Sequence, residues 1–246
     1  MTTTDVLYGL NPAFEAVLAG RREIRRALLS RSASANPRVQ KLAALLESRG
    51  VAVQWSEKGR LIDLCQSHEH QGVVLETGPY PYVTAAELLA LPRLVLLDNL
   101  EDPHNVGAII RTAEVLGYGG VLLPNRGVPH VLPSVVKASA GATEHLRICC
   151  AGGVTAYVTA ARDLDFTIVA LDAHGTRSLA EVAAAAPERL LLVCGGEDRG
   201  VGQYILNQAH FVVRIPQHGR TSSLNASVAA GIALHALAAP APGSMT

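Results

Sequence analysis

The chain has 246 residues, of which 49% are hydrophobic and 17% are charged, and its 21 basic and 21 acidic side chains give a formal net charge of zero. This composition excludes an intrinsically disordered chain and predicts a buried globular core. No apolar run is long enough for a membrane-spanning helix, and the first residues have neither the basic nor the apolar part of a targeting peptide. We therefore expect a cytoplasmic protein without membrane contact.

Four cysteines occur, at positions 65, 149, 150 and 194. They form no C-x-x-C pair, and the histidines near them lack the spacing of zinc ligands. We therefore expect reduced thiols and no metal. Cys194 adjoins a glycine turn, but a small buried strand residue explains it better than a nucleophile.

The first 77 residues alternate short helices with short strands. We predict helices over residues 11–19, 39–48 and 59–65, and strands over residues 24–29, 51–55 and 72–76. These elements predict a small α/β domain of three strands over residues 1–77. Six clustered arginines in it suit either phosphate binding or a solvated face: Arg21, Arg22, Arg25, Arg26, Arg31 and Arg38.

A break in this pattern follows at residues 78–92. Gly78, Pro79 and Pro81 oppose regular structure there and predict a linker. A short helix over residues 84–91 is expected before a second domain, which we place at residues 93–246.

The second domain alternates strands and helices more regularly. We predict strands over residues 94–97, 120–123, 167–171, 190–193 and 211–214. Helices are predicted over residues 108–116, 134–138, 154–162, 202–207 and 227–237. Because the strands are apolar runs separated by helices, they predict a five-stranded parallel sheet.

Polar residues gather after three of these strands. The first group extends from Asp98 to Asn105, the second follows Cys194 in a glycine-rich turn, and the third precedes the last helix. Open α/β sheets bind ligands at the carboxyl ends of their strands, so we expect the three groups to converge on one pocket. The alternative for the third group is a simple helix cap by Ser223 or Asn225.

Three motifs in this order resemble the SpoU family of RNA ribose 2′-O-methyltransferases, of the knotted (SPOUT) class. The first is N-x-G-x-x-x-R, with Asn105, Gly107 and Arg111, and the second is the turn that ends in Glu197. The third is I-P followed by S-S-L-N, with these residues: Ile215, Pro216, Ser222, Ser223, Leu224 and Asn225. The N-terminal part, with Tyr8-Gly9 and the run H-Q-G-V at residues 70–73, is similar to the RlmB type of 23S ribosomal RNA guanosine enzymes.

The resemblance implies an α/β fold with a SPOUT-type parallel sheet and a C-terminal trefoil knot, preceded by a small α/β RNA-binding domain. Pattern alone would not suggest a knot. The resemblance also implies a homodimer and S-adenosylmethionine as the methyl donor. It assigns Gly195, Ile215 and Leu224 to cofactor binding, although Ile215 and Leu224 are equally compatible with a place in the core.

The catalytic residues that the resemblance implies are Arg111, Asn105, Glu197, Ser223 and Asn225. In the family, the arginine is assigned to activating the 2′-hydroxyl. Because arginine is effectively never deprotonated, we expect Arg111 instead to stabilise the developing alkoxide and to pair with a phosphate. Each assignment has a structural alternative, such as an ion pair of Arg111 with Glu114, helix-terminal charge for Glu197, or a cap for Asn225.

We therefore predict a methyltransferase that acts on a guanosine of large-subunit ribosomal RNA. Two alternatives remain open: a transfer RNA guanosine 2′-O-methyltransferase, and a non-catalytic RNA-binding protein of the same fold. A nicotinamide-dependent oxidoreductase is not supported, because Gly195-Gly196 lacks the G-x-G-x-x-G spacing at a helix start.

Overall fold

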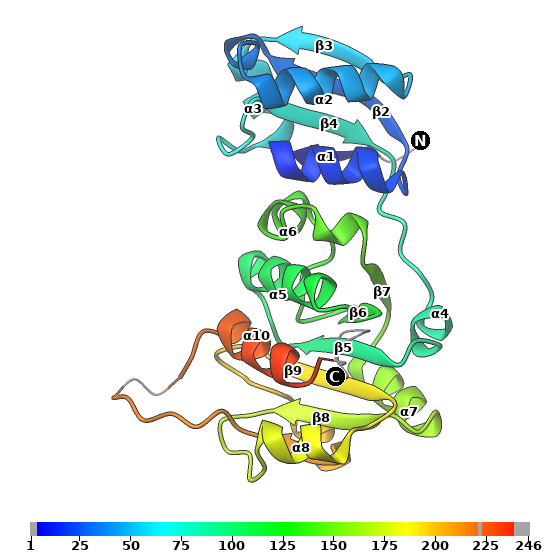
Figure 1. Ribbon diagram of the computed structural model, residues 1–246, viewed down its shortest axis with the longest axis vertical. Helices are drawn as coiled ribbons and strands as arrows, with labels where there is room; N and C mark the ends of the chain where they lie inside the picture. The colour runs from blue at the N-terminus through cyan, green and yellow to red at the C-terminus, as the bar shows by residue number, and fades with distance from the viewer. Residues whose placement is uncertain (1–3, 221–222, 239–246) are drawn as a thin grey trace, which may run out of the picture. The chain divides into compact units, whose positions relative to one another are not determined.

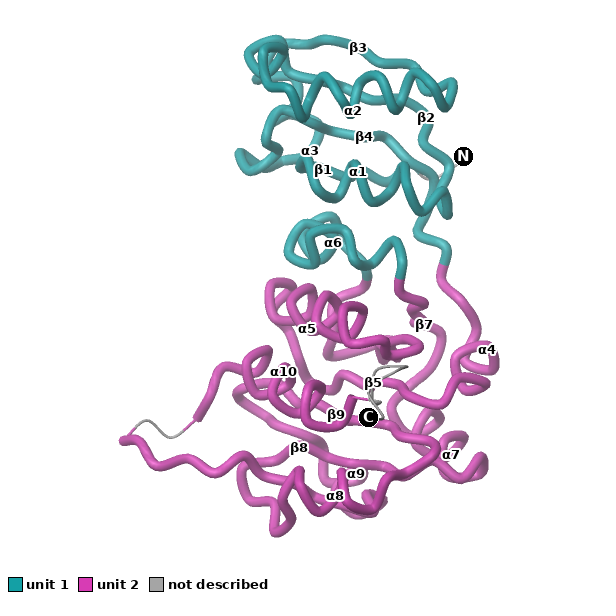
Figure 2. Tube along the Cα trace, in the orientation of Figure 1, with its two compact units in different colours: residues 1–81, 131–145 teal, residues 82–130, 146–246 magenta. Residues whose placement is uncertain are grey.

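The structure is a computed structural model that describes residues 4–220 and 223–238. The chain forms two compact units (Figure 2). The first contains residues 1–81 and 131–145, and the second contains residues 82–130 and 146–246. Residues 131–145 lie in sequence inside the predicted second domain, but they pack with the first unit.

The first unit has a mixed four-stranded sheet of order β1-β4-β2-β3 (Figure 1). Strands β2 and β3 pair in parallel, whereas β4 pairs antiparallel with both β1 and β2. The strands are β1 (Asp5–Tyr8), β2 (Ile24–Ser30), β3 (Ala52–Ser56) and β4 (Val73–Thr77). The helices are α1 (Leu10–Ala19), α2 (Pro37–Ser48), α3 (Lys58–Cys65), α6 (Pro133–Ala138) and the 3₁₀ turns η1 (Arg31–Ala33) and η2 (Ala142–Glu144).

The prediction of three strands in this region was wrong, because β1 adds a fourth. This strand has only four residues, and its partner β4 lies about 70 residues away, with Tyr8 opposite Val74. A short strand stabilised by a distant partner leaves little local pattern in the sequence.

Most of the clustered arginines are engaged inside the first unit. Arg26 forms two hydrogen bonds of 2.6 Å with Glu76, and Arg22 is bound to Glu144. Because Arg22 and Arg26 are already paired with carboxylates, these two cations are not available to bind phosphate.

Arg22 and Glu144 form a buried bidentate ion pair, with distances of 2.8 and 2.7 Å. Both side chains are 1% exposed. We expect Glu144→Ala to lower the free energy of unfolding of this unit by about 3–5 kcal/mol, because it removes the bidentate partner of a buried guanidinium and leaves only Asp5, at 4.0 Å. Urea unfolding followed by the fluorescence of Trp55, the single tryptophan, which lies in β3, measures this effect. The double change Arg22→Met with Glu144→Leu should cost much less; an equal or larger loss would contradict the explanation.

The second unit contains a six-stranded sheet of order β10-β8-β9-β5-β6-β7, with every pairing parallel. Its strands are β5 (Arg93–Asp98), β6 (Gly120–Pro124), β7 (Arg147–Gly152), β8 (Thr167–Leu171), β9 (Leu190–Gly195) and β10 (Phe211–Val213). Its helices are α4 (Ala85–Leu89), α5 (Pro103–Val115), α7 (Val154–Asp163), α8 (Leu179–Ala185), α9 (Gln203–Gln208) and α10 (Ala226–Ala236).

Helices cover both faces of this sheet (Figure 1). Side chains of α4, α7 and α9, including Leu88, Tyr157 and Ile205, pack against alternate residues of the strands. Helices α5 and α10 lie side by side. Such double coverage explains why the central strands are continuous apolar runs.

Three features of this unit differ from the sequence prediction. Strand β7 makes the sheet six-stranded instead of five-stranded, and α8 was not predicted. Helix α5 begins at Pro103, five residues before the predicted start, because Asp102 caps it by accepting from the His104 N–H at 2.9 Å. Among the described residues, no helix has the length and apolar character needed to cross a membrane.

Candidate active site

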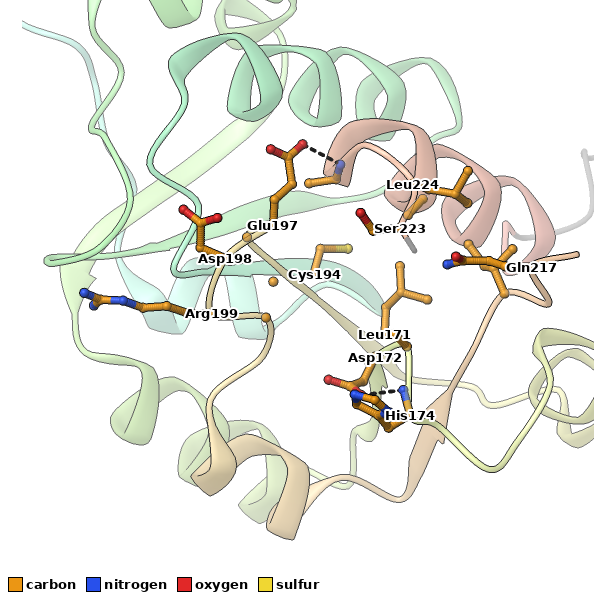
Figure 3. Close-up of a pocket in the computed structure, with 17 residues that line it drawn as sticks. Leu171, Asp172, His174, Cys194, Glu197, Asp198, Arg199, Gln217, Ser223 and Leu224 are labelled. Atoms are coloured by element: carbon orange, nitrogen blue, oxygen red, sulfur yellow. Dashed lines mark hydrogen bonds between the residues drawn. The ribbon is translucent and has the colours of Figure 1, made fainter. Parts of the chain in front are cut away.

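A hollow of about 320 Å³ lies at the carboxyl ends of β8 and β9 (Figure 3). Residues 171–174, at the end of β8, and residues 194–200, at the end of β9, line it, together with residues before and inside the start of α10. Gly195, Ile215 and Leu224 all line this hollow, so the structure brings the three predicted cofactor-binding residues to one place.

Gly195, the last residue of β9, and Gly196 are required by close packing of the chain. A Cβ on Gly196 would lie 1.9 Å from the carbonyl oxygen of Asn99, and one on Gly195 would lie 2.3 Å from the carbonyl carbon of Gly200. No side chain fits at either position. The glycine-rich turn is therefore explained by the way this loop folds on itself and on the end of β5.

Three of the predicted catalytic residues form one hydrogen-bond network. Glu197 Oε1 accepts from Asn225 Nδ2 at 2.8 Å and from Asn105 Nδ2 at 3.3 Å. It also accepts from the Ala226 N–H at 3.1 Å, a bond drawn in Figure 3. Asn225 Nδ2 lies 2.9 Å from Asn105 Oδ1, to which it also donates. Loops that are far apart in sequence are thus joined around a single carboxylate.

Asn225 is both the helix cap and a member of this network. Its Oδ1 accepts from the N–H groups of Ser227 at 3.0 Å and Val228 at 3.3 Å, which caps α10. Its Nδ2 is left to bind Glu197. Ser223 is exposed and lines the hollow, whereas Ser222 lies outside the described residues.

A second hollow of about 280 Å³ is lined on one side by residues 99–102 and Asn105 and on the other by residues 196–199. Glu197 lines both hollows, and Asn105 lines only the second. The loop after β9 therefore forms a wall shared by two adjacent spaces.

Two predicted catalytic residues line neither hollow: Asn225, which is hydrogen-bonded to Glu197, and Arg111. Arg111 is exposed on α5, and it has no hydrogen bond or ion pair with any residue in the described part of the chain. The alternative of an ion pair with Glu114 is thus absent among the described residues.

Sequence reasoning missed the segment after β8. Asp172 lines the first hollow, accepts from the His174 N–H at 2.8 Å, and donates its own N–H to the Val213 carbonyl at 2.9 Å. The signal was present, because Asp172 directly follows a predicted strand, as Asp98 and Cys194 do in their own segments. The rule that ligands bind at the carboxyl ends of parallel strands therefore indicates this segment as well.

Charge in the first hollow is mostly negative. Its lining contains three carboxylates, those of Asp172, Glu197 and Asp198, and one arginine, Arg199, so it suits a ligand with cationic character. Cys194 also lines this space, but burial raises the pKa of its thiol to about 12. The thiol therefore stays protonated at neutral pH, as expected for a structural residue.

This fold and site define a class of α/β protein, in which parallel strands present polar loops to a ligand at their carboxyl ends. The chain belongs to the SpoU rRNA methylase family, whose model matches residues 92–235. The model for RNA 2′-O ribose methyltransferase substrate binding matches residues 6–83. Both models describe proteins that act on RNA, and together they cover most of the chain.

Individual relatives agree with this assignment. An uncharacterized tRNA/rRNA methyltransferase of Mycolicibacterium vanbaalenii is 31% identical over 242 residues, which cover 96% of this chain and 76% of the relative. A crystal structure of an RNA 2′-O ribose methyltransferase is 25% identical with a TM-score of 0.79, covering 95% of this chain and 87% of that one. The AdoMet-bound rRNA methyltransferase of Sinorhizobium meliloti shares the fold, with a TM-score of 0.78 at 24% identity, and the match covers 95% and 86% of the two chains.

Proposed function

We propose that this protein transfers the methyl group of S-adenosylmethionine to the ribose 2′-hydroxyl of a guanosine in 23S ribosomal RNA, and that it acts as a homodimer in the cytoplasm. The observation that carries the proposal is the network of Glu197, Asn105 and Asn225 at the edge of a ligand-sized hollow, in a chain of the SpoU family. Residues 1–77 are proposed as the RNA-binding domain, in agreement with the substrate-binding model.

The first hollow fits the proposed cofactor in size and charge. Its volume is at the lower end of the range typical of small-molecule sites. Leu171, Ile215 and Leu224 offer apolar surface for a purine, and Asp172 and Glu197 offer carboxylates for hydroxyl, ammonium and sulfonium groups. When bound, S-adenosylmethionine supplies an activated methyl group with a neutral thioether as the leaving group.

The residues of this chain then have to orient the 2′-hydroxyl and stabilise its developing charge. We assign orientation to the joined side chains of Asn105, Glu197 and Asn225, which are held by hydrogen bonds before substrate arrives. Ser223 contacts the cofactor or the Arg111 that the partner subunit supplies. Arg111 stabilises the alkoxide and pairs with a neighbouring phosphate, since a guanidinium does both without losing its proton.

In this proposal, the Arg111 of one subunit acts in the site of the other subunit. Arg111 and Val115 are four residues apart on α5 and therefore share one face of that helix. Val115 is 72% exposed, and α10, which packs on α5, exposes Val228 and Ile232. Apolar side chains exposed on two adjacent helices favour burial against a second copy of this chain. Such an interface places the exposed Arg111 next to the other subunit.

The proposed homodimer should dissociate when a charge is introduced into its interface. We expect Ile232→Glu, at a 41% exposed position on α10, to shift the protein from dimer to monomer in light scattering coupled to gel filtration. Leu18→Glu, at a 55% exposed apolar position on α1, is the matched control and should leave the dimer intact. A wild-type protein that is monomeric at micromolar concentration would overturn this part of the proposal.

We also propose that the chain is knotted near its C-terminus. The support is the path after β10, because the edge strand β10 is followed by residues that line the hollow beside β9, such as Ile215 and Leu224, and then by α10. This return across the carboxyl ends of the strands supports a knotted path. A crystal structure with a continuous trace through residues 215–226 tests it.

The choice of 23S ribosomal RNA depends on the N-terminal resemblance to the RlmB type. Transfer RNA is the alternative substrate, and the M. vanbaalenii relative is named for both RNA classes. Incubation with S-adenosylmethionine carrying a labelled methyl group, together with ribosomal or transfer RNA, separates the two. We expect label on a guanosine ribose of 23S RNA. Label on transfer RNA alone would contradict the substrate, and cofactor binding without transfer to either RNA would favour the non-catalytic RNA-binding protein.

A further inference from the structure

Asp98 connects the end of β5 to both ends of the loop that follows β9. Its backbone carbonyl oxygen accepts from the Gly196 N–H at 3.0 Å. Its carboxylate Oδ2 accepts from the Gly202 N–H at 2.8 Å and from Asn99 Nδ2 at 3.2 Å. Because Asp98 is only 7% exposed, this carboxylate is a buried anchor shared by two segments that are distant in sequence.

Asn99 also holds the loop that follows β9, through both its backbone and its side chain. Its φ of 50° lies in the left-handed region, which asparagine tolerates better than most residues. Its Nδ2 also donates to the carbonyl oxygen of Gly200 at 3.3 Å, and its own carbonyl oxygen occupies the position where Gly196 would carry a Cβ. Within the loop, the Gly200 N–H donates to the Gly196 carbonyl at 2.9 Å. The loop is therefore fixed at both ends and at its middle.

Glu197 lies between the two anchored ends. Its Oε1 receives three donors, at 2.8, 3.1 and 3.3 Å, from two other parts of the chain. These bonds form together only while the loop keeps its position, since a displacement of about 1 Å would lengthen them beyond hydrogen-bond range. The anchor at Asp98 therefore determines where the Glu197 carboxylate lies.

We propose that Asp98 is a positioning residue for methyl transfer, which acts by holding residues 196–202 so that Glu197 joins Asn105 and Asn225. This inference rests on the proposed function, in which those three side chains orient the acceptor. Asp98 itself lines neither hollow, so it has no direct contact with either proposed ligand.

The anchor depends on an acceptor oxygen and not on a negative charge. Burial raises the pKa of the Asp98 carboxyl, although hydrogen bonds from the backbone N–H groups of Gly202 and Asn99 oppose the rise. An asparagine at this position presents one oxygen to the same two donors and avoids the cost of a buried charge. Asp98→Asn should therefore preserve the anchor, whereas Asp98→Ala removes it.

The first test measures the loop directly and needs no substrate. Hydrogen exchange of a peptide that contains the Gly196 and Gly202 amides should accelerate by about tenfold or more in Asp98→Ala and remain near wild type in Asp98→Asn. A second pair avoids changing Asp98. Gly202 has a φ of −61°, which proline accepts, so Gly202→Pro removes the N–H donor. Gly202→Ala keeps that N–H and controls for the added Cβ, which both variants place 3.2 Å from Asp98 Oδ2. Exchange at Gly196 that is no faster in Asp98→Ala and Gly202→Pro than in Asp98→Asn and Gly202→Ala would overturn the anchor.

The second test measures whether Asp98 acts through Glu197. We expect Asp98→Ala to lower kcat on the order of 10²-fold, as misplacement of a reacting group does, and Asp98→Asn to restore most of it. In a Glu197→Ala background, the further loss from Asp98→Ala should be no more than about threefold, because the residue it positions is already gone. Losses that multiply would show a general effect on stability and overturn the proposal. A wild-type protein that transfers no methyl group would instead refute the proposed function and leave the exchange result standing.

Discussion

Arg111→Ala should abolish methyl transfer to RNA while leaving the Kd for S-adenosylmethionine within about threefold of wild type. Removal of one group that stabilises transition-state charge costs about 10²–10³-fold in kcat. Arg111 lines neither hollow of its own subunit, so its loss should not disturb the proposed cofactor site. Single-turnover methylation with saturating cofactor, together with calorimetric titration of the cofactor, measures both quantities.

Two variants control for the loss of positive charge. Arg162→Ala removes another exposed arginine, on α7, and should reduce kcat by less than about threefold. Arg111→Lys keeps the charge but loses the planar fork, so it should recover only part of the activity. Cofactor binding that disappears together with turnover in Arg111→Ala would mean that its role has been misplaced.

Glu197→Ala is expected to reduce both turnover and cofactor affinity. The substitution leaves Asn105 Nδ2, Asn225 Nδ2 and the Ala226 N–H without their shared acceptor, and Asn105 is buried. The start of α10, which carries residues of the first hollow, then loses its tie to the loop after β9. We expect kcat to fall on the order of 10²-fold and the cofactor Kd to rise about tenfold.

Glu197→Gln keeps a hydrogen-bond acceptor at this position and removes the negative charge. Its single amide oxygen occupies the position of Oε1 and accepts the same bonds, so it should recover most of the cofactor affinity that Glu197→Ala loses, and the remaining deficit measures the contribution of the charge. Wild-type turnover in Glu197→Ala, at saturating concentrations of both ligands, would remove this carboxylate from the proposed machinery.

Local sequence pattern was sufficient where an element is stabilised by its own neighbours. The central strands β5, β8 and β9 are apolar on both faces, and their ranges agree with the predicted ones within two residues. Local pattern failed where a strand pairs with a remote strand, and where polar residues at the start of a helix resemble a loop. Strand β1 depends on β4, and the first turn of α5 contains Asp102, Pro103 and His104, which resemble a loop until the cap is recognised.

In the candidate site, too, local pattern predicted some features and could not predict those that depend on remote residues. The predicted convergence after β5, β9 and β10 needed only the rule that parallel strands end at one edge, and Glu197, Asn105 and Asn225 do meet there. The role of Asp98 was beyond the sequence, because nothing local shows that its carboxylate reaches the Gly202 N–H. The same holds for Arg22, whose buried partner Glu144 is more than a hundred residues away.

A crystal structure of the protein with S-adenosylmethionine and a short RNA is the most direct test of the account. We predict the adenosyl group in the hollow lined by Gly195, Ile215 and Leu224, with the methyl carbon facing a ribose oxygen held beside Asn105 and Glu197. Arg111 of the partner subunit should then lie within hydrogen-bond distance of that oxygen or its phosphate. A cofactor bound elsewhere, or an Arg111 remote from the methyl carbon in both subunits, would contradict the account.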